Sequence, residues 1–260
     1  MLHHEISGNG KKPLVLLHGF MENTTIWDEM EAHLSKDFTL IKIDLPGHGK
    51  SKNYHEINTP DFMSEKVKEV IDFLKLEKIN LLGHSLGGYV SLAFAEKFPD
   101  FLESMTLFFS TTLPDDEEKK NIRKRSIAVM DENFSTFVKT SIPNLFSYNE
   151  KDILEGKIEL AKKIAKSNNL EGMKAAQLGM AERPNRTEIL EKLDAKILII
   201  AGKYDNAVKT ESLLKLIPEK TNIKTYVLDC GHNGHWEKPT ICAEIINTEL
   251  LHNLPKHFLL

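Results

Sequence analysis

The sequence is poor in cysteine, since its 260 residues contain only Cys230 and Cys242. Two thiols cannot form the disulfide framework of a small secreted protein, and they fit a reducing compartment. Long apolar runs are also missing, because no stretch reaches the roughly 18 apolar residues of a membrane-spanning helix. The N-terminal sequence MLHHEISGNGKKP lacks the apolar run of a signal peptide. We therefore expect a cytoplasmic protein without a membrane partner.

A surplus of positive charge is absent as well. The 34 basic residues face 38 acidic ones, which gives a formal net charge of −4. Nucleic-acid binding needs a concentrated basic patch, so this balance argues against a nucleic-acid partner. The ordinary globular composition, 41% hydrophobic and 28% charged, suits one large domain. We expect a small-molecule substrate and a monomer or homodimer.

Short apolar runs of strand length alternate with amphipathic helical segments. The runs occupy residues 13–19, 38–44, 78–84, 103–109, 195–202 and 223–229. They are nearly continuous in apolar character, as expected for parallel strands buried on both faces. Between them lie segments with helical spacing, such as the one carrying Val67, Val70, Ile71 and Leu74. Repeated strand–helix–strand units predict an α/β fold with a mostly parallel central sheet flanked by helices.

One interval interrupts this alternation. Residues 111–194 contain charged, helical-looking stretches and no convincing strand. So long an interval is not a plain loop. We interpret it as a helical cap inserted into a core of residues 1–110 and 195–260, with a crossover elaborated for stability as the alternative. Its apolar side chains are candidates for a pocket lining or for the cap's own core: Ile127, Met130, Phe134, Phe137, Phe146, Met173 and Met180.

The tripeptide Gly49-Lys50-Ser51 matches the end of a phosphate-binding loop. That loop needs a second glycine five positions before Gly49, and the sequence has Asp44 at that position. Pro46 also removes one backbone donor. The glycines therefore indicate a tight turn at a strand end, and the chain is not a nucleotide triphosphatase.

The stretch Gly83-His84-Ser85-Leu86-Gly87-Gly88 lies between a predicted strand and a predicted helix. In that context the pattern G-x-S-x-G places a serine hydroxyl on a sharp turn above the sheet. The strained backbone at Ser85 requires small neighbours, and Gly83 and Gly87 flank it. The following helix directs its N-terminus at the site, which favours the negative charge that develops in acyl transfer.

A serine nucleophile needs a base, and the base needs an orienting acid. Asp205 follows the predicted strand 195–202, and His232 follows the strand 223–229, so both stand just past strand ends. Asp229 and Glu237 are rival acids, but one ends a strand and the other lies beyond His232.

At this point the chain resembles the α/β-hydrolase superfamily along nearly its whole length. The matching motifs are His18-Gly19-Phe20, Asp44-Leu45-Pro46-Gly47-His48-Gly49, the Ser85 turn, Gly202-Lys203-Tyr204-Asp205 and Gly231-His232. The resemblance implies about eight strands with a cap after the sixth. It assigns Ser85 as nucleophile, His232 as base and Asp205 as its acid, and it places oxyanion-hole donors at the backbone amides of Phe20 and Leu86. His18 and His48 are expected to support the loops.

The loop CGHNGHWEKP, residues 230–239, contains two histidines. His232 comes directly from the strand end and is our choice for the base. A metal site at H-x-x-H would need a third ligand and usually a helical frame, and the sequence offers neither, so no metal is expected. Further candidates for the substrate pocket, each with structural packing as its alternative, are His84, Ser110, Phe134, His235 and Trp236.

All four arginines lie in the inserted segment: Arg123, Arg125, Arg183 and Arg186. One of them could select an acidic substrate through bidentate geometry, although a solvated charged face is the alternative. The leading hypothesis is a serine hydrolase of small carboxylic esters or lactones that needs no cofactor. A second reading rests on the resemblance of GHNGHWEKP and LLHGF to the menaquinone-pathway lyase of this superfamily: a lyase, or a carbon–carbon hydrolase, for carboxylate-bearing substrates. A small-molecule receptor is a third.

Overall fold

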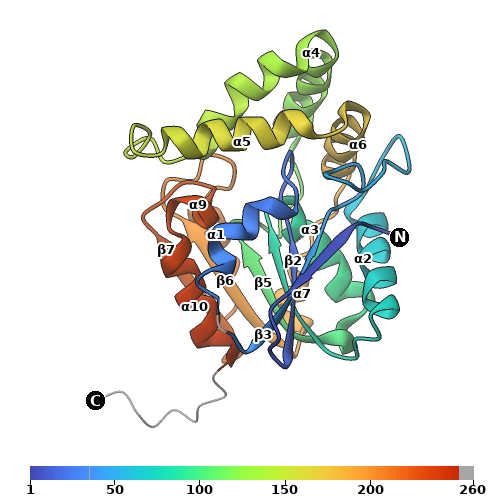
Figure 1. Ribbon diagram of the computed structural model, residues 1–260, viewed down its shortest axis with the longest axis vertical. Coiled ribbons are helices and arrows are strands. Elements are labelled where there is room, and N and C mark those ends of the chain that lie inside the picture. The colour runs from blue at the N-terminus through green and yellow to red at the C-terminus, as the bar shows by residue number, and fades with distance from the viewer. Residues whose placement is uncertain (35, 252–260) are drawn as a thin grey trace.

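A computed structural model of the chain describes residues 1–34 and 36–251. These residues form a seven-stranded sheet with helices on both faces (Figure 1). The strands are β1 His4–Ser7, β2 Lys12–Leu17, β3 Phe38–Ile43, β4 Ile79–His84, β5 Leu102–Phe108, β6 Lys196–Gly202 and β7 Ile223–Leu228. The helices of the core are α1 Asp28–Glu31, α2 Pro60–Phe73, α3 Leu86–Lys97, α8 Thr210–Leu214, α9 Gly234–Glu237 and α10 Pro239–Leu251. Short 3₁₀ turns occupy Thr24–Trp27, Pro99–Phe101 and Ile142–Leu145.

All six predicted strands are present, with ends close to those expected. The expectation of about eight strands is close to the observed seven. The sequence reading missed only β1 among the seven, because its four residues, HEIS, are half-buried or exposed and carry no apolar run. The strand order is β1-β3-β2-β4-β5-β6-β7, and every neighbouring pair is parallel except β1 with β3. The carboxyl ends of β2, β4, β5, β6 and β7 therefore meet at one edge.

The sheet is buried on both faces by two separate apolar clusters. Leu14 and Leu16 of β2 belong to the cluster that includes α1, α9 and α10, whereas Val15 and Leu17 belong to the cluster that includes α2 and α3. This division follows from the alternation of side chains along a strand. Both sets of side chains are apolar, which explains why the strands read as continuous apolar runs.

The segment between β5 and β6 contains α4 Glu117–Ser141, α5 Glu155–Ser167, α6 Leu170–Ala181 and α7 Glu188–Lys192. Residues 111–194, all of them described, contain no strand. Figure 1 shows α4, α5 and α6 above the carboxyl-end edge of the sheet. Helix α4 is broken at Asn133, whose backbone is extended (φ −162°, ψ 91°) and whose side chain accepts the N–H of Thr136. The break turns the second half of α4 toward the sheet edge.

The loop after β3 has no anion-binding geometry. The carboxylate of Asp44 accepts the backbone N–H groups of Thr24 and Lys50 at 2.8 and 2.9 Å. A carboxylate of the chain therefore already takes the donors that a phosphate would need. This agrees with the reading of Gly49-Lys50-Ser51 as a turn. No helix within residues 1–34 and 36–251 is long and apolar enough to cross a membrane.

Candidate active site

Ser85 lies on a strained turn between β4 and α3. Its backbone has φ 48° and ψ −109°, a conformation that non-glycine residues rarely adopt. The N–H of Ser85 donates to the carbonyl of Phe108 at 3.0 Å, which ties the turn to β5. A side chain at Gly83 would place its Cβ 2.2 Å from the carbonyl oxygen of Gly87, so the glycine permits the crossing of strand and helix.

Ser110 supports this turn from below. Its hydroxyl donates to the carbonyl of Ser85 at 2.8 Å, and the residue is buried. The side-chain hydroxyl of Ser110 thus points at the backbone of the turn, and the residue is not among those that line the pocket described below.

His232 and Asp205 form a buried pair at the neighbouring strand ends. Nδ1 of His232 donates to Oδ2 of Asp205 at 2.7 Å. The other carboxylate oxygen, Oδ1, accepts the N–H groups of Ala207 and Val208 at 2.8 and 2.9 Å. These bonds fix the carboxylate and the tautomer of the ring, so Nε2 of His232 is left as a lone pair for proton abstraction.

The two effects on the pKa of His232 oppose each other. Burial alone would lower this pKa, because it disfavours the imidazolium. The charge of Asp205 and its hydrogen bond to the ring outweigh burial, so the pKa is raised above its ordinary value. The pair thus stabilises the cation that forms when His232 accepts a proton.

The rival acids have other contacts. Asp229 pairs with Lys203 at 3.1 Å on the exposed surface. Glu237 is buried and accepts the N–H groups of Ser147, Gly231 and Asn233 at 3.0, 2.9 and 3.1 Å. Glu237 therefore holds the loop that carries His232. The carboxylate that pairs with the His232 ring is that of Asp205, not that of Asp229 or Glu237.

The two proposed oxyanion donors are the backbone amides of Leu86, which follows Ser85 in the chain, and of Phe20, in the loop after β2. Leu86 is the first residue of α3, so its N–H has no acceptor inside the helix. The N–H of Phe20 finds no acceptor within residues 1–34 and 36–251. Phe20 precedes Met21, whose φ of 63° lies in the left-handed region, and this unusual loop follows directly from β2.

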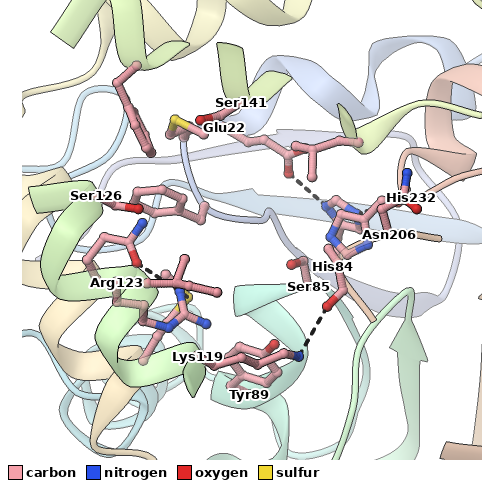
Figure 2. A pocket seen from close by; sticks show the side chains of 18 residues that line it. Glu22, His84, Ser85, Tyr89, Lys119, Arg123, Ser126, Ser141, Asn206 and His232 are labelled. Carbon is pink, nitrogen blue, oxygen red and sulfur yellow. Dashed lines mark hydrogen bonds and ion pairs between the residues drawn. The ribbon is translucent and has the colours of Figure 1, made fainter. Parts of the chain in front are cut away.

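A pocket of about 300 Å³ opens between the sheet edge and α4 and α6. Both Ser85 and His232 line it, and Figure 2 shows their side chains on one side of the cavity, opposite Arg123 and Ser126. The other lining residues are Phe20, Met21, Glu22, His84, Tyr89, Lys119, Ile122, Phe137, Ser141, Leu145, Gln177, Met180, Asn206 and Ala207.

Three of the other pocket candidates lie outside this lining. Phe134 packs partly buried against the core, one residue after the break in α4. His235 is fully buried, with its ring centroid 5.9 Å from that of Trp27. Trp236 stacks on Phe146 with centroids 6.1 Å apart and an interplanar angle of 5°. The pocket lining thus does not include these three residues. His235 and Trp236 belong to α9, and both are buried.

The cap arginines are mostly engaged in ion pairs. Arg123 and Arg183 share the carboxylate of Asp115, and Arg123 also donates to Gln177 at 2.8 Å. Arg186 pairs with Asp61 and Glu96 at 2.7 and 2.9 Å. Only Arg123 lines the pocket.

Lys119 also lines the pocket, and it was not among the residues predicted from the sequence. Its ammonium donates to the carbonyl of Ala207 at 3.4 Å, and no carboxylate oxygen of the described residues lies within 4.0 Å of it. Burial lowers the pKa of Lys119. The nearby charge of Asp115 opposes this effect, and the charges of Arg183 and Arg123 add to it. The residue stands in the sequence DDEEKK, which looks like a solvated charge run.

Glu22, His84 and His235 bring potential ligand atoms within 4.8 Å of one another. Both ring nitrogens of His84, however, already have oxygen partners. A metal ligand must offer a free lone pair, so the cluster fits a metal poorly. The expectation of a cofactor-free protein stays a prediction.

A mostly parallel sheet with a serine turn, an acid and a histidine at successive strand ends is the arrangement of an α/β hydrolase. The family described as alpha/beta hydrolase fold matches residues 12–239. The chain belongs to the α/β-hydrolase family.

The individual relatives are named for different reactions. An esterase from Thermogutta terrifontis, solved with malate bound, is 31% identical, covers 96% of this chain and 93% of its own, and superimposes with a TM-score of 0.89. A Bacillus subtilis protein with the provisional name 2-succinyl-6-hydroxy-2,4-cyclohexadiene-1-carboxylate synthase is 29% identical over 92% of this chain and 90% of its own. A 2-hydroxy-6-oxononadienedioate/2-hydroxy-6-oxononatrienedioate hydrolase of Escherichia coli K12 is 26% identical over 91% and 86%. The family therefore fixes the fold and leaves the substrate open.

We predict that Gly83→Ala destabilises the protein by more than about 2 kcal/mol, because the added methyl group meets backbone that cannot move aside. Gly156→Ala is the matched control, since a Cβ there meets nothing within 4 Å and the position lies in α5. It should be neutral or stabilising by up to about 1 kcal/mol. Urea denaturation of both variants measures the difference, and equal stabilities would contradict the packing described for the turn.

We predict that His232→Ala lowers kcat by at least about 1,000-fold, because the base is lost. His235→Leu, which replaces a buried ring without hydrogen-bond partners, should stay within about tenfold of wild type. Steady-state kinetics on one ester decides between the two histidines. The reverse ranking would show that His235 is the base.

Proposed function

We propose that the protein hydrolyses small carboxylic esters or lactones through an acyl-enzyme on Ser85. The observation that carries the proposal is the hydrogen bond of 2.7 Å between His232 and Asp205 at the edge of a pocket that Ser85 also lines. The esterase relative, at 31% identity over nearly the whole chain, supports this reaction class.

The proposed reaction begins when Nε2 of His232 takes the proton of the Ser85 hydroxyl. The hydroxyl oxygen attacks the carbonyl carbon, and the N–H groups of Phe20 and Leu86 stabilise the oxyanion. His232 then gives the proton to the leaving alcohol as the ester bond breaks. A water molecule, activated by the same base, hydrolyses the acyl-enzyme and restores the serine. In a lactone the leaving alcohol stays attached to the acyl group throughout, and hydrolysis of the acyl-enzyme releases a single hydroxy acid.

The helices between β5 and β6 would act as a cap that selects the substrate. The pocket of about 300 Å³ suits a small acyl group. Its cap side contains Lys119 and Arg123, with Arg183 behind them. Arg123 and Arg183 share the carboxylate of Asp115, whereas Lys119 has no carboxylate of the described residues within 4.0 Å. This surplus of positive charge favours a substrate that carries a carboxylate.

The same charge favours a second candidate function. The relatives from Bacillus subtilis and Escherichia coli are named for reactions of carboxylate substrates. A lyase or carbon–carbon hydrolase would use Ser85 and His232 on a substrate held by Lys119. A receptor without turnover has no specific observation in its favour.

The first test is turnover of short p-nitrophenyl esters, lactones and a dienoic carbon–carbon substrate by wild type and Ser85→Ala. We predict turnover of the short esters, and a decrease in kcat of about 10,000-fold or more in the variant. Circular dichroism controls for folding. Turnover of the dienoic substrate but of no ester or lactone would contradict ester hydrolysis and favour the lyase or carbon–carbon hydrolase. Saturable binding without turnover would contradict both enzymatic proposals.

Lys119→Gln tests the charge of the pocket. We predict a KM about tenfold higher for a carboxylate-bearing ester such as a p-nitrophenyl hemisuccinate, which corresponds to about 1.4 kcal/mol, and a change below about twofold for p-nitrophenyl butyrate. Lys120→Gln, on the neighbouring residue that pairs with Glu117 at 2.8 Å, is the matched control. An equal effect of Lys119→Gln on both esters would contradict the proposal that Lys119 binds a carboxylate of the substrate.

A further inference from the structure

A buried carboxylate and a buried imidazole connect three loops of the site. Oε2 of Glu22 accepts the N–H of Gly19 at 2.6 Å and lies 2.8 Å from Nδ1 of His84. Nε2 of His84 lies 3.0 Å from the carbonyl oxygen of His232. Figure 2 shows the His84 ring between the Glu22 and His232 positions. His84 itself directly precedes Ser85, so the pair connects the loop of Phe20 and the backbone of His232 to the Ser85 turn.

The partners of the His84 ring determine how many protons it carries. The carbonyl oxygen of His232 can only accept, so Nε2 must be an N–H. An ionised carboxylate can also only accept, so Nδ1 must be an N–H as well. A neutral imidazole has one N–H. A neutral histidine beside an ionised carboxylate holds one proton between them. Both hydrogen bonds of the ring therefore form only when the pair Glu22–His84 holds two.

The geometry favours the ring as the site of that proton, because Oε2 of Glu22 faces two donors, the N–H of Gly19 at 2.6 Å and Nδ1 of His84 at 2.8 Å, and two donors stabilise the ionised carboxylate. With the proton on the ring, the charge of His84 and its hydrogen bond outweigh burial and lower the pKa of Glu22 to about 2. The carboxylate is therefore ionised at neutral pH. The hydrogen bond from Gly19 stabilises the same ionised form.

His18 shows the opposite case in the same neighbourhood. Its Nε2 accepts the N–H of Leu45 at 3.0 Å, so its Nδ1 is the only N–H and donates to the carbonyl of Gly19 at 2.7 Å. Burial lowers the pKa of His18, in agreement with a neutral ring. One bond network thus predicts a neutral His18 and a doubly protonated His84.

We infer that His84 is held as an imidazolium by the carboxylate of Glu22, and that this ion pair positions the oxyanion loop and the base loop relative to Ser85. Glu22 and His84 are positioning residues, because they act through Gly19 and His232. Their effect on turnover rests on the proposed function, whereas the protonation state does not.

The other titratable groups close to His84 are His232 and His235, and neither supplies a negative charge that could balance an imidazolium. The ring centroids of His232 and His235 lie 5.0 and 4.7 Å away. Burial lowers the pKa of His235 to about 3, so this ring is neutral, and His232 pairs with Asp205. Nε2 of His235 stands 3.6 Å from Oε1 of Glu22, beyond hydrogen-bond distance. Glu22 is thus the counterion of His84.

The direct test is a long-range ¹H–¹⁵N NMR spectrum of the protein labelled with ¹⁵N-histidine, recorded near pH 7.5. Spectra of His84→Asn and His18→Asn assign the two rings. We expect two protonated nitrogens for His84 and one for His18. A single protonated nitrogen on His84 would overturn the inference, and so would a stoichiometric metal ion in the purified protein by elemental analysis. This measurement needs no substrate, so it stands even if ester turnover fails.

Glu22→Gln tests the positioning role. A neutral glutamine cannot stabilise the imidazolium, so His84 keeps one ring proton. One of three bonds is then lost: that of His84 to position 22, that of His84 to His232, or that of Gly19 to position 22. We expect one protonated nitrogen on His84 and a kcat roughly 10- to 100-fold lower with KM nearly unchanged, the effect of reacting groups displaced by a fraction of an ångström. Glu103→Gln, the same change on the exposed start of β5, is the control. A wild-type kcat in Glu22→Gln would refute the positioning role.

Discussion

The close approach of β4 and α3 at Gly83 and Gly87 is the constraint on which the rest of the site depends. Only glycine leaves room for the carbonyl of Gly87 at this crossing. The crossing forces Ser85 into a strained backbone conformation. Strain at one residue can persist because the surrounding structure over-determines it, here through the bonds of Ser85 to Phe108 and Ser110. The serine hydroxyl consequently lies at the sheet edge where the other strand ends meet.

Three buried carboxylates then hold the loops around that serine. Asp205 accepts two backbone N–H groups and the His232 ring, Glu237 accepts three backbone N–H groups, and Glu22 accepts Gly19 and the His84 ring. Removing a carboxylate from water is costly unless hydrogen bonds replace its hydration. Each acid therefore fixes the donors that surround it. The proposed base His232, its loop and the loop of Phe20 are held in this way by ionic hydrogen bonds at the edge of the sheet.

Features with a short-range signature could be predicted from the sequence. The six buried strands follow from apolar runs, and the positions of Ser85, Asp205 and His232 follow from strand ends and from the resemblance. Strand β1 could not be predicted, because it pairs with β3 without an apolar run of its own. Lys119 and Glu22 were missed because their surroundings are assembled from distant segments. The same reason explains why Phe134, His235 and Trp236 lie outside the pocket lining, since the sequence does not reveal which side of a short helix such as α9 is buried.

The central claim is that Ser85 is the nucleophile and that His232 activates it. The most direct measurement is mass spectrometry of the protein after reaction with diethyl p-nitrophenyl phosphate, which phosphorylates an activated serine. The account predicts one diethylphosphoryl group per chain, located on Ser85, with loss of esterase activity in proportion to labelling, and no labelling of His232→Ala on the same timescale. Labelling at another residue, or full activity in protein modified at Ser85, would contradict it.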